Sequence, residues 1–467
     1  MSASAIHFGT SGWRGIIAED FTFSQVRRAV AAIAKFLKIE KSESRGVVVG
    51  HDTRFFSEEF AREAGKILQS HSIPSYRCAS AAPTPAIAFE IVRRAAAGGI
   101  NFTASHNPAA YNGLKFSGAN GAPALPEVTR EIEKIAGAIT EEDFYGRGAA
   151  ISESMEVRDG YLDDLATKID LRAIAAANLH FVFDPLFGCG SGYLDHLLKQ
   201  HGVKVETVHA QRDTLFGGHT PDPSEERLAE TGARVAASGA ALGLATDGDA
   251  DRFGILDRDG HFVSPNHLIG LLADYLHETR GWREGLARSV ATTHLVDAVG
   301  QHHGLPVYET AVGFKYMGEL LMSGKIFLGG EESAGLTIRG HVPEKDGILA
   351  CLLAAEMVAK RGASLGEQLD SLFRKVGSYY PRRINLPLTA KIQDRLKEEL
   401  KRDFATFGGR KVARADRTDG LKLLFEDDTW ILLRVSGTEP VCRIYCEGHS
   451  QAESDALTEI AKTFVTG

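Results

Sequence analysis

The sequence has few of the features that mark secreted, disulfide-stabilised proteins. Its five cysteines are odd in number and widely scattered, so they do not indicate a disulfide framework. Cys442 and Cys446 lie four residues apart in an expected strand, which separates them by about 13 Å, too far for a disulfide or a shared metal ion. We therefore expect reduced cysteines in a protein core.

Long apolar segments and an excess of basic charge are also missing. The longest apolar run, residues 348–355, is far shorter than the ~20 residues that span a bilayer. The first ten residues contain neither a basic stretch nor an apolar signal core, so export is not expected. The formal net charge of −8 argues against a broad nucleic-acid surface. We expect a cytoplasmic protein that binds neither membrane nor nucleic acid.

The sequence does have the composition of an ordinary globular protein, with 43% hydrophobic and 24% charged residues. Its 467 residues are too many for one core and indicate several domains. Its 49 glycines are more than average usage predicts, which draws attention to loops where the backbone approaches another group closely.

Short β-branched runs alternate with amphipathic stretches through most of the chain. The pattern predicts a helix capped by Ser24 and a second helix over residues 57–70. Helical crossovers make successive strands parallel, so this pattern predicts α/β units with mostly parallel sheets. The expected strands are residues 46–50, a run ending at Phe102, 180–184, 203–208 and 242–246, and runs near Val290, Val307 and Ile326.

The last ~90 residues have a different pattern. Residues 421–425 and 429–435 predict a hairpin, residues 442–446 a further strand, and residues 452–464 a closing helix. The predicted fold is therefore three similar α/β domains with mixed, mostly parallel sheets, plus a smaller C-terminal α+β domain, around a central cleft. We place the domains at residues 1–150, 151–257, 258–377 and 378–467.

A hydroxyl beside an imidazole follows one expected strand, in residues 103–108 (TASHNP). Ser105 is the candidate nucleophile and His106 its neighbour. The alternative is a capped turn, because Ser, Asn and Pro are common turn residues. Ser105 does not lie in a Gly-x-Ser-x-Gly elbow, which disfavours acyl transfer.

Three carboxylates, Asp247, Asp249 and Asp251, follow another expected strand. They would repel one another strongly unless a hard cation lay between them, although a solvated acidic turn is the alternative. An EF-hand is excluded because Arg252 and Arg258 stand where that loop needs Gly and Glu. Oxygen ligands without Cys or His indicate Mg²⁺ rather than zinc.

Two further loops offer groups for a sugar phosphate. Residues 329–335 (GGEESAG) carry carboxylates that can accept hydrogen bonds from vicinal hydroxyls, although a surface turn is the alternative. Residues 434–440 (RVSGTEP) combine a guanidinium with hydroxyls and glycine-exposed backbone donors, which suits a phosphate, although a simple hairpin is the alternative.

Together, these four loops in this order resemble the α-D-phosphohexomutase family. Residues 9–15 (GTSGWRG) and 112–116 (NGLKF) extend the resemblance over essentially the whole chain. In that family each of four domains contributes one loop to a central cleft. The resemblance implies that Ser105 is phosphorylated in the active enzyme, and that Ser105, Asp247, Asp249 and Asp251 hold Mg²⁺.

The resemblance also implies the other site residues. Arg14, His106 and Lys115 join Ser105 as catalytic residues. The substrate-binding residues would be Arg252, Lys315, Glu331, Ser333, Lys345, Arg434, Ser436, Gly437, Thr438 and Arg443. His106, Lys115 and Lys345 are the candidates for proton transfer. Gly335 stands where bacterial dual-specificity relatives have His, so that position supplies no acid or base here.

The sugar loop favours one subfamily. Residues 330–333 (GEES) are similar to the phosphoglucomutase form, whereas phosphoglucosamine mutases carry Gln, and many dual-specificity enzymes Met, at Glu332. Residues 343–347 (PEKDG) also resemble the glucomutase pattern. The expected activity interconverts glucose 1-phosphate and glucose 6-phosphate through glucose 1,6-bisphosphate, which acts as intermediate and activator, in a monomer or homodimer.

Alternatives to this activity remain open at the level of the sequence. The enzyme could be a phosphomannomutase or a dual-specificity phosphohexomutase, because mannose and glucose differ by the position of one hydroxyl. A bisphosphate synthase would differ only in releasing the intermediate. A non-catalytic sugar-phosphate sensor is a hypothesis of another class, and the candidate nucleophile and metal ligands count against it.

Overall fold

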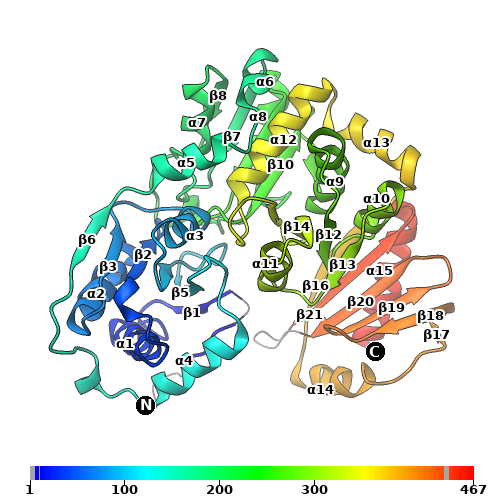
Figure 1. Ribbon diagram of the computed structural model, residues 1–467. Coiled ribbons are helices and arrows are strands. Elements are labelled where there is room, and N and C mark those ends of the chain that lie inside the picture. The colour runs from blue at the N-terminus through cyan, green and yellow to red at the C-terminus, as the bar shows by residue number, and fades with distance from the viewer. Residues whose placement is uncertain (1–5, 10, 436–440) are drawn as a thin grey trace. The chain divides into compact units, whose positions relative to one another are not determined.

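The computed structural model describes residues 6–9, 11–435 and 441–467. The chain forms two compact units (Figure 1). The first contains the described residues up to Pro265 together with Ser333–Leu365, and the second contains Asn266–Glu332 and the described part of Gly366–Gly467. A segment from late in the chain therefore belongs to the first unit.

The first sheet of the first unit is mixed, with strand order β1-β5-β4-β2-β3-β6. β2 is parallel to β3 and β4, and β3 is parallel to β6, whereas β5 is antiparallel to both of its neighbours. The strands are β1 (Trp13–Ile16), β2 (Val47–His51), β3 (Ser75–Cys78), β4 (Gly98–Phe102), β5 (Tyr111–Gly118) and β6 (Ser152–Met155). The helices are α1 (Phe23–Ile39), α2 (Ser57–Ser70), α3 (Thr84–Arg93) and α4 (Pro126–Ala138), with short 3₁₀ turns η1 (Glu43–Arg45) and η2 (Glu141–Asp143).

The start of α1 corrects one prediction. Thr22, not Ser24, is the N-cap, and its Oγ1 accepts a hydrogen bond from the Gln25 backbone N–H at 3.3 Å. Thr22 still has extended backbone angles, which the capping geometry requires, whereas Ser24 already lies inside the first turn. The helix therefore begins two residues earlier than predicted.

The second sheet has the strand order β11-β10-β9-β7-β8 and is also mixed. Its strands are β7 (His180–Asp184), β8 (Lys204–Thr207), β9 (Leu242–Thr246), β10 (Phe253–Asp257) and β11 (Phe262–Val263). The other elements of the first unit are α5 (Arg158–Ala166), α6 (Leu171–Ala176), α7 (Leu194–Gln200), η3 (Phe216–Gly218), α8 (Ala229–Ser238), β15 (Gly335–Ile338) and α12 (Gly347–Arg361). Helix α12 is buried from Gly347 to Val358 and packs against β9 and β10, where Cys351 Sγ lies 3.5 Å from the carbonyl oxygen of Ala245.

The second unit begins with a parallel arrangement in which β12 pairs with both β13 and β14. Its C-terminal part is an antiparallel sheet in the order β16-β21-β20-β19-β18-β17. The α/β part contains α9 (Pro265–Arg280), β12 (Gly285–Ser289), α10 (Leu295–His303), β13 (Val307–Thr310), α11 (Phe314–Met322), β14 (Ile326–Glu331) and α13 (Leu365–Val376). The C-terminal part contains β16 (Tyr380–Pro387), α14 (Ala390–Glu399), β17 (Thr406–Phe407), β18 (Arg410–Asp416), β19 (Leu421–Phe425), β20 (Trp430–Val435), β21 (Val441–Gly448) and α15 (Gln451–Thr466).

A buried lysine, Lys422, joins the two parts of this unit. Its Nζ donates to the Val290 carbonyl at 2.8 Å, lies 2.9 Å from His294 Nε2 and 3.1 Å from Glu309 Oε2, and stacks over the Trp430 ring. Burial and the nearby Arg288 guanidinium lower the pKa of Lys422 to about 8, although Glu309 and Glu447 oppose this shift. The folded protein therefore disfavours the charged form of Lys422 relative to an exposed lysine.

The architecture confirms the predicted fold class of three α/β domains followed by a C-terminal domain with an antiparallel sheet. All five cysteines are free and buried, as expected.

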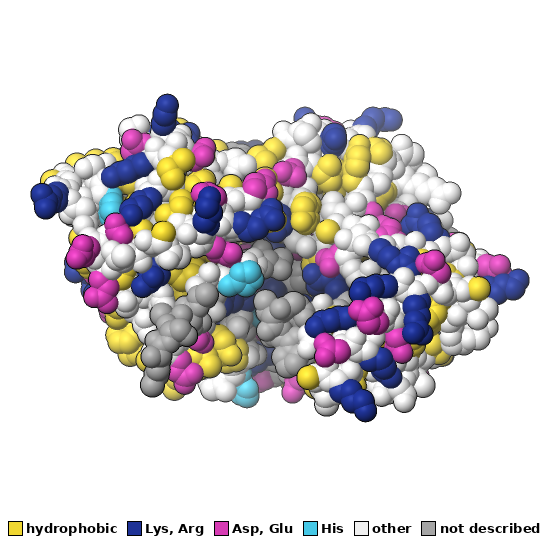
Figure 2. Space-filling model, turned by 90° about the horizontal axis from the view of Figure 1, so that it is seen from below, with side chains coloured by type: hydrophobic (Ala, Val, Ile, Leu, Met, Phe, Trp, Pro, Cys, Tyr) yellow, Lys and Arg dark blue, Asp and Glu magenta, His cyan; other side chains and the backbone are white. Residues whose placement is uncertain are grey.

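Among the described residues, none of the helices combines the length and apolarity that a membrane span requires. Acidic and basic side chains are interspersed on the face seen in Figure 2, which is typical of a surface without a broad field of one sign. The domain boundaries stay predictions.

Candidate active site

The three aspartates predicted to bind metal lie together in the first unit. They occupy the loop between the antiparallel strands β9 and β10, and Asp247, Asp249 and Asp251 are all buried. One carboxylate oxygen from each lies within 4.8 Å of the others. Three aspartates that alternate with other residues in the sequence thus have their carboxylates close together in the folded loop.

The oxygens of this cluster divide into partnered and unpartnered atoms. Oδ2 of Asp249 accepts from Lys115 Nζ at 2.5 Å, and Oδ2 of Asp251 accepts from Lys115 Nζ at 2.6 Å and from Lys345 Nζ at 2.9 Å. Oδ1 of Asp249 and Oδ1 of Asp251 are buried and have no hydrogen-bond partner among the described residues. Because buried carboxylate oxygens without partners are costly, these atoms fit a hard divalent cation such as Mg²⁺.

Burial and the neighbouring charges shift the pKa values of the aspartates in opposite directions. Burial, with the neighbouring charges of Asp249 and Asp251, raises the pKa of Asp247 well above its usual range. Burial acts in the same direction on Asp251, but Lys115 and Lys345 outweigh it and hold the pKa of Asp251 far below the usual range. The two lysines therefore neutralise part of the cluster, and a cation would neutralise more.

Ser105 lies directly beside the aspartates. Its Oγ donates to Asp247 Oδ2 at 2.7 Å, and His106 Nδ1 lies 3.4 Å from Ser105 Oγ. Ser105 is buried and has a φ of +52°, a left-handed conformation that is uncommon for residues other than glycine. Its own backbone N–H donates to Thr103 Oγ1 at 2.9 Å. The loop thus presents its hydroxyl to the carboxylates in a constrained geometry.

The Ser105 loop is held by Arg54, which sequence reasoning missed. Arg54 is fully buried, and its two terminal nitrogens donate to four carbonyl oxygens of the loop, those of Ser105, Asn107, Pro108 and Tyr111, at 2.6 to 3.1 Å. The charge is balanced by Asp52, whose Oδ2 lies 3.1 Å from Arg54 Nε. The sequence feature that could have indicated this ion pair is the presence of Asp52 and Arg54 directly after the buried strand β2.

Two further predicted residues also lie at this loop. Arg14 on β1 donates from Nη1 to Asn107 Oδ1 at 2.5 Å. Burial, together with the charges of Arg252 and Arg14, lowers the pKa of His106 well below its ordinary value. At neutral pH the imidazole is therefore uncharged and has a nitrogen lone pair that can accept a proton.

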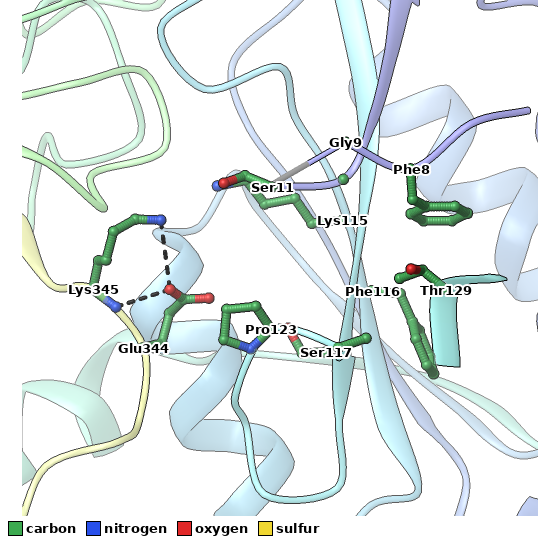
Figure 3. A pocket seen from close by; sticks show the side chains of 12 residues that line it. Phe8, Gly9, Ser11, Lys115, Phe116, Ser117, Pro123, Thr129, Glu344 and Lys345 are labelled. Atoms are coloured by element: carbon green, nitrogen blue, oxygen red, sulfur yellow. Dashed lines mark hydrogen bonds and ion pairs between the residues drawn. The ribbon is translucent and has the colours of Figure 1, made fainter. Parts of the chain in front are cut away.

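A small cavity lies next to the lysines of the cluster (Figure 3). Its volume is about 30 Å³, which is close to the volume that one water molecule occupies. Lys115 and Lys345 line it together with Glu344, whose Oε1 accepts from the Lys345 backbone N–H at 2.8 Å. Burial raises the pKa of Glu344. Glu344 was not predicted, although it directly precedes the predicted Lys345.

The predicted sugar loop straddles the boundary of the two units. Glu331 is the last residue of β14 in the second unit, and its Oε1 accepts from the Gly313 backbone N–H at 2.7 Å. Ser333 belongs to the first unit. Lys315 lies in the first turn of α11, where its Nζ stacks over the ring of Tyr316.

The predicted phosphate loop follows β20, and its Ser436, Gly437 and Thr438 lie outside the described residues. Arg434 on β20 faces Arg443 on β21 in the antiparallel register. Asp419 contacts Arg434 through Oδ1 at 2.7 Å and accepts from the Val312 backbone N–H at 3.1 Å through Oδ2. Like charges opposite each other in a ladder are unfavourable, and the Asp419 carboxylate supplies an opposite charge to this pair.

The chain matches known proteins over nearly all of its length. It matches the families described as phosphoglucomutase/phosphomannomutase alpha/beta/alpha domain I at residues 5–143, domain II at 159–260, domain III at 264–376, and C-terminal domain at 384–462. It is 33% identical to a phosphoglucomutase/phosphomannomutase of Thermococcus kodakarensis over 97% of each chain. It is 30% identical to a protein named as a phosphoglucosamine mutase from Methanosphaera stadtmanae over 98% of each chain. A solved structure from Thermus thermophilus that carries the name phosphomannomutase superposes with a TM-score of 0.88, at 33% identity over 100% of each chain.

Proposed function

Because the chain belongs to the phosphoglucomutase/phosphomannomutase family and is therefore a phosphohexomutase-type enzyme, we propose that it is a phosphoglucomutase. It would interconvert glucose 1-phosphate and glucose 6-phosphate through a phosphorylated Ser105 and glucose 1,6-bisphosphate. The observation that carries this proposal is the position of Ser105 Oγ, 2.7 Å from Asp247 in a buried cluster where two carboxylate oxygens have no partner among the residues that the structure describes.

In the proposed reaction a hydroxyl of the sugar attacks the phosphorus of phosphorylated Ser105. A new oxygen–phosphorus bond forms, the bond from phosphorus to Ser105 Oγ breaks, and the proton of the sugar hydroxyl passes to a base on the enzyme. Of the three predicted candidates for proton transfer, His106 is the candidate for that base, because its pKa is lowered, whereas burial is outweighed by the aspartates, which raise the pKa values of Lys115 and Lys345 and keep both lysines protonated. The bisphosphate then turns end for end, so that its other phosphate returns to Ser105 and the product leaves.

Positioning and charge stabilisation make up most of what such a transfer requires. Mg²⁺, held by Ser105 and the three aspartates, would supply a positive charge that offsets the charge developing on the phosphoryl oxygens. Arg14, Lys115 and Arg252 add positive charge from the chain itself.

The other loops would recognise the substrate. Glu331 and Ser333 address the hydroxyls of the sugar, while Lys315 and Lys345 contribute charge. The phosphate that is not reacting would bind Arg434, Arg443 and the loop residues Ser436, Gly437 and Thr438. The positions of Arg434 and Arg443 opposite each other on β20 and β21 support this assignment, because a guanidinium group is a good phosphate ligand.

The preference for glucose rests on Glu332. Its carboxylate accepts from Ser289 Oγ at 3.2 Å and Thr292 Oγ1 at 3.4 Å, which fixes the side chain at the end of β14. The named relatives include enzymes for glucose, mannose and glucosamine phosphates, so mannose 1-phosphate or dual specificity is the alternative. We further propose a cytoplasmic enzyme, monomeric or homodimeric, with domains at residues 1–150, 151–257, 258–377 and 378–467.

A substrate panel tests this function. Glucose, mannose and glucosamine 1-phosphates are compared in a coupled assay with Mg²⁺, with and without added glucose 1,6-bisphosphate. We expect glucose 1-phosphate to have the highest kcat/KM, and turnover that does not depend stoichiometrically on the bisphosphate. Accumulation of the bisphosphate as the end product would indicate a synthase, and a higher kcat/KM for another sugar would correct the substrate.

Replacement of the nucleophile tests the covalent step. Ser105→Ala should abolish turnover, because the variant lacks the hydroxyl that lies beside Asp247 and carries the phosphoryl group in the proposed reaction. Folding and sugar-phosphate binding should persist, which thermal unfolding and calorimetry can check. Retained turnover in this variant would refute the phosphoserine route, and wild-type protein that binds sugar phosphate without turnover would instead support a sensor.

A further inference from the structure

Asp249 receives an unusual amount of support from helix α3, which lies outside the metal loop. The Thr84 backbone N–H donates to the Asp249 carbonyl oxygen at 2.9 Å, and Thr84 Oγ1 donates to Asp249 Oδ2 at 2.5 Å. Thr84 is the first residue of α3, where backbone N–H groups lack helical partners and the helix dipole favours a negative charge. The end of the helix and its first side chain therefore both bind the same aspartate.

The direction of the hydrogen bond from Thr84 is set by Asn101. Asn101 Nδ2 donates to Thr84 Oγ1 at 2.9 Å. A hydroxyl has a single proton, so an oxygen that accepts from Asn101 keeps its proton for Asp249. Both side chains are buried, with 4% of each residue exposed, so water does not compete for these bonds.

These contacts decide which oxygen of Asp249 is left for a ligand. Oδ2 is occupied by Thr84 and by Lys115, which is the register partner of Asn101 across β4 and β5. Oδ1 is buried and has no hydrogen-bond partner within the described part of the chain. The carboxylate is therefore held in one rotation, with Oδ1 left for a ligand within the aspartate cluster.

We infer that Thr84, fixed by Asn101, is a positioning residue that orients Asp249 Oδ1 for binding a divalent cation. This inference rests on the proposed metal site of the mutase and adds to it two residues from a different part of the chain. Groups that hydrogen-bond to a metal ligand restrict its motion, and their loss typically weakens metal binding by about 10- to 100-fold.

The test is calorimetric titration of MgCl₂ into metal-stripped enzyme, with the phosphorylation of Ser105 matched by intact mass. Thr84→Val removes the hydroxyl with little change of volume, and we expect a Kd for Mg²⁺ about 10- to 100-fold higher than in the wild type. Thr84→Ser keeps the hydroxyl and should stay within about threefold of the wild type. Asn101→Ala should have an intermediate effect, because the bond from Thr84 to Asp249 remains possible.

Thr231→Val provides a matched control. Thr231 Oγ1 also donates to a buried aspartate, Asp184 Oδ2, at 2.6 Å, but Asp184 is not part of the cluster. This variant should lose thermal stability like Thr84→Val and keep the Mg²⁺ affinity of the wild type. Unchanged affinity in Thr84→Val, lost affinity in Thr84→Ser, or equal loss in Thr231→Val would each overturn the inference alone. A wild type that binds no Mg²⁺ would overturn the metal site of the proposed function as well.

Discussion

Removal of the Arg54 guanidinium is the perturbation that the structure makes most informative. Arg54 makes four hydrogen bonds to carbonyl oxygens of the Ser105 loop, pairs with Asp52, and stacks over the Phe216 ring at 4.8 Å. Burial lowers the pKa of Arg54 and raises that of Asp52, so burial disfavours the charged form of each and their pairing opposes this effect. Arg54→Met leaves Asp52 buried without its partner.

The size of the effect follows from these contacts. Breaking a buried ion pair by removing one partner costs about 3–5 kcal/mol of unfolding free energy. Arg54→Lys keeps a positive charge near Asp52 but loses the planar fork that reaches four carbonyls, so we expect a smaller loss of about 1–2 kcal/mol. In both variants kcat should fall about 100-fold, because a shift of roughly 1 Å in a reacting group has that effect.

Urea denaturation and steady-state kinetics measure the two effects separately. The double variant Asp52→Asn with Arg54→Met should recover part of the lost stability, because no unpaired charge remains buried, while kcat should stay low. Intact mass spectrometry reports whether Ser105 is still phosphorylated. Full kcat in Arg54→Lys would refute the positioning role, and wild-type stability in Arg54→Met would refute the importance of the ion pair.

Two further variants test the charges of the site and of the fold. Asp249→Asn should raise the Mg²⁺ concentration for half-maximal activity at least about tenfold, because a neutral amide is a poorer ligand for a hard cation, and an unchanged Mg²⁺ requirement would contradict the assigned ligand. Lys422 has a folded-state pKa of about 8, below the ordinary value of 10.5, so between these values the unfolded chain binds more protons than the folded chain. This residue should therefore make stability rise with pH from 8 to 10.5, by up to about 3 kcal/mol, and Lys422→Met should flatten that rise in urea titrations at several pH values. Equal pH slopes in the two proteins would show that the lysine titrates normally.

Local pattern explains why several elements could be predicted to the residue. Helix α2 at Ser57–Ser70 and the strands β7, β9 and β19 have the predicted bounds, because their apolar residues repeat with the period of the element that they form. The start of α1 was predicted wrongly because Thr and Ser are both good N-cap residues. The structure decided between them, since Thr22 has the extended backbone angles of an N-cap and Ser24 is already helical.

The sequence by itself also indicated candidate site residues, and the clustering of the three aspartates is confirmed. Ser105 and the three aspartates follow buried strands, and each motif consists of neighbours in the chain, so the sequence raised a nucleophile and a cation site as hypotheses beside a capped turn and an acidic turn, and the family resemblance favoured the former. Arg54 and Thr84 could not be found in this way. Arg54 reaches carbonyl oxygens up to 57 residues away, and Thr84 contacts an aspartate 165 residues away.

The tertiary structure decided how that chemistry is held. Every residue has a backbone carbonyl, so a side chain that hydrogen-bonds to a carbonyl places no requirement on the type of its partner residue. Such a contact therefore cannot be recognised from residue types in the sequence. The apolar run at residues 348–355 likewise did not indicate that its helix, α12, packs on β9 and β10 of the first unit. Residue types therefore fix which groups can react, whereas the long-range hydrogen bonds and packing that orient those groups exist only in the folded chain.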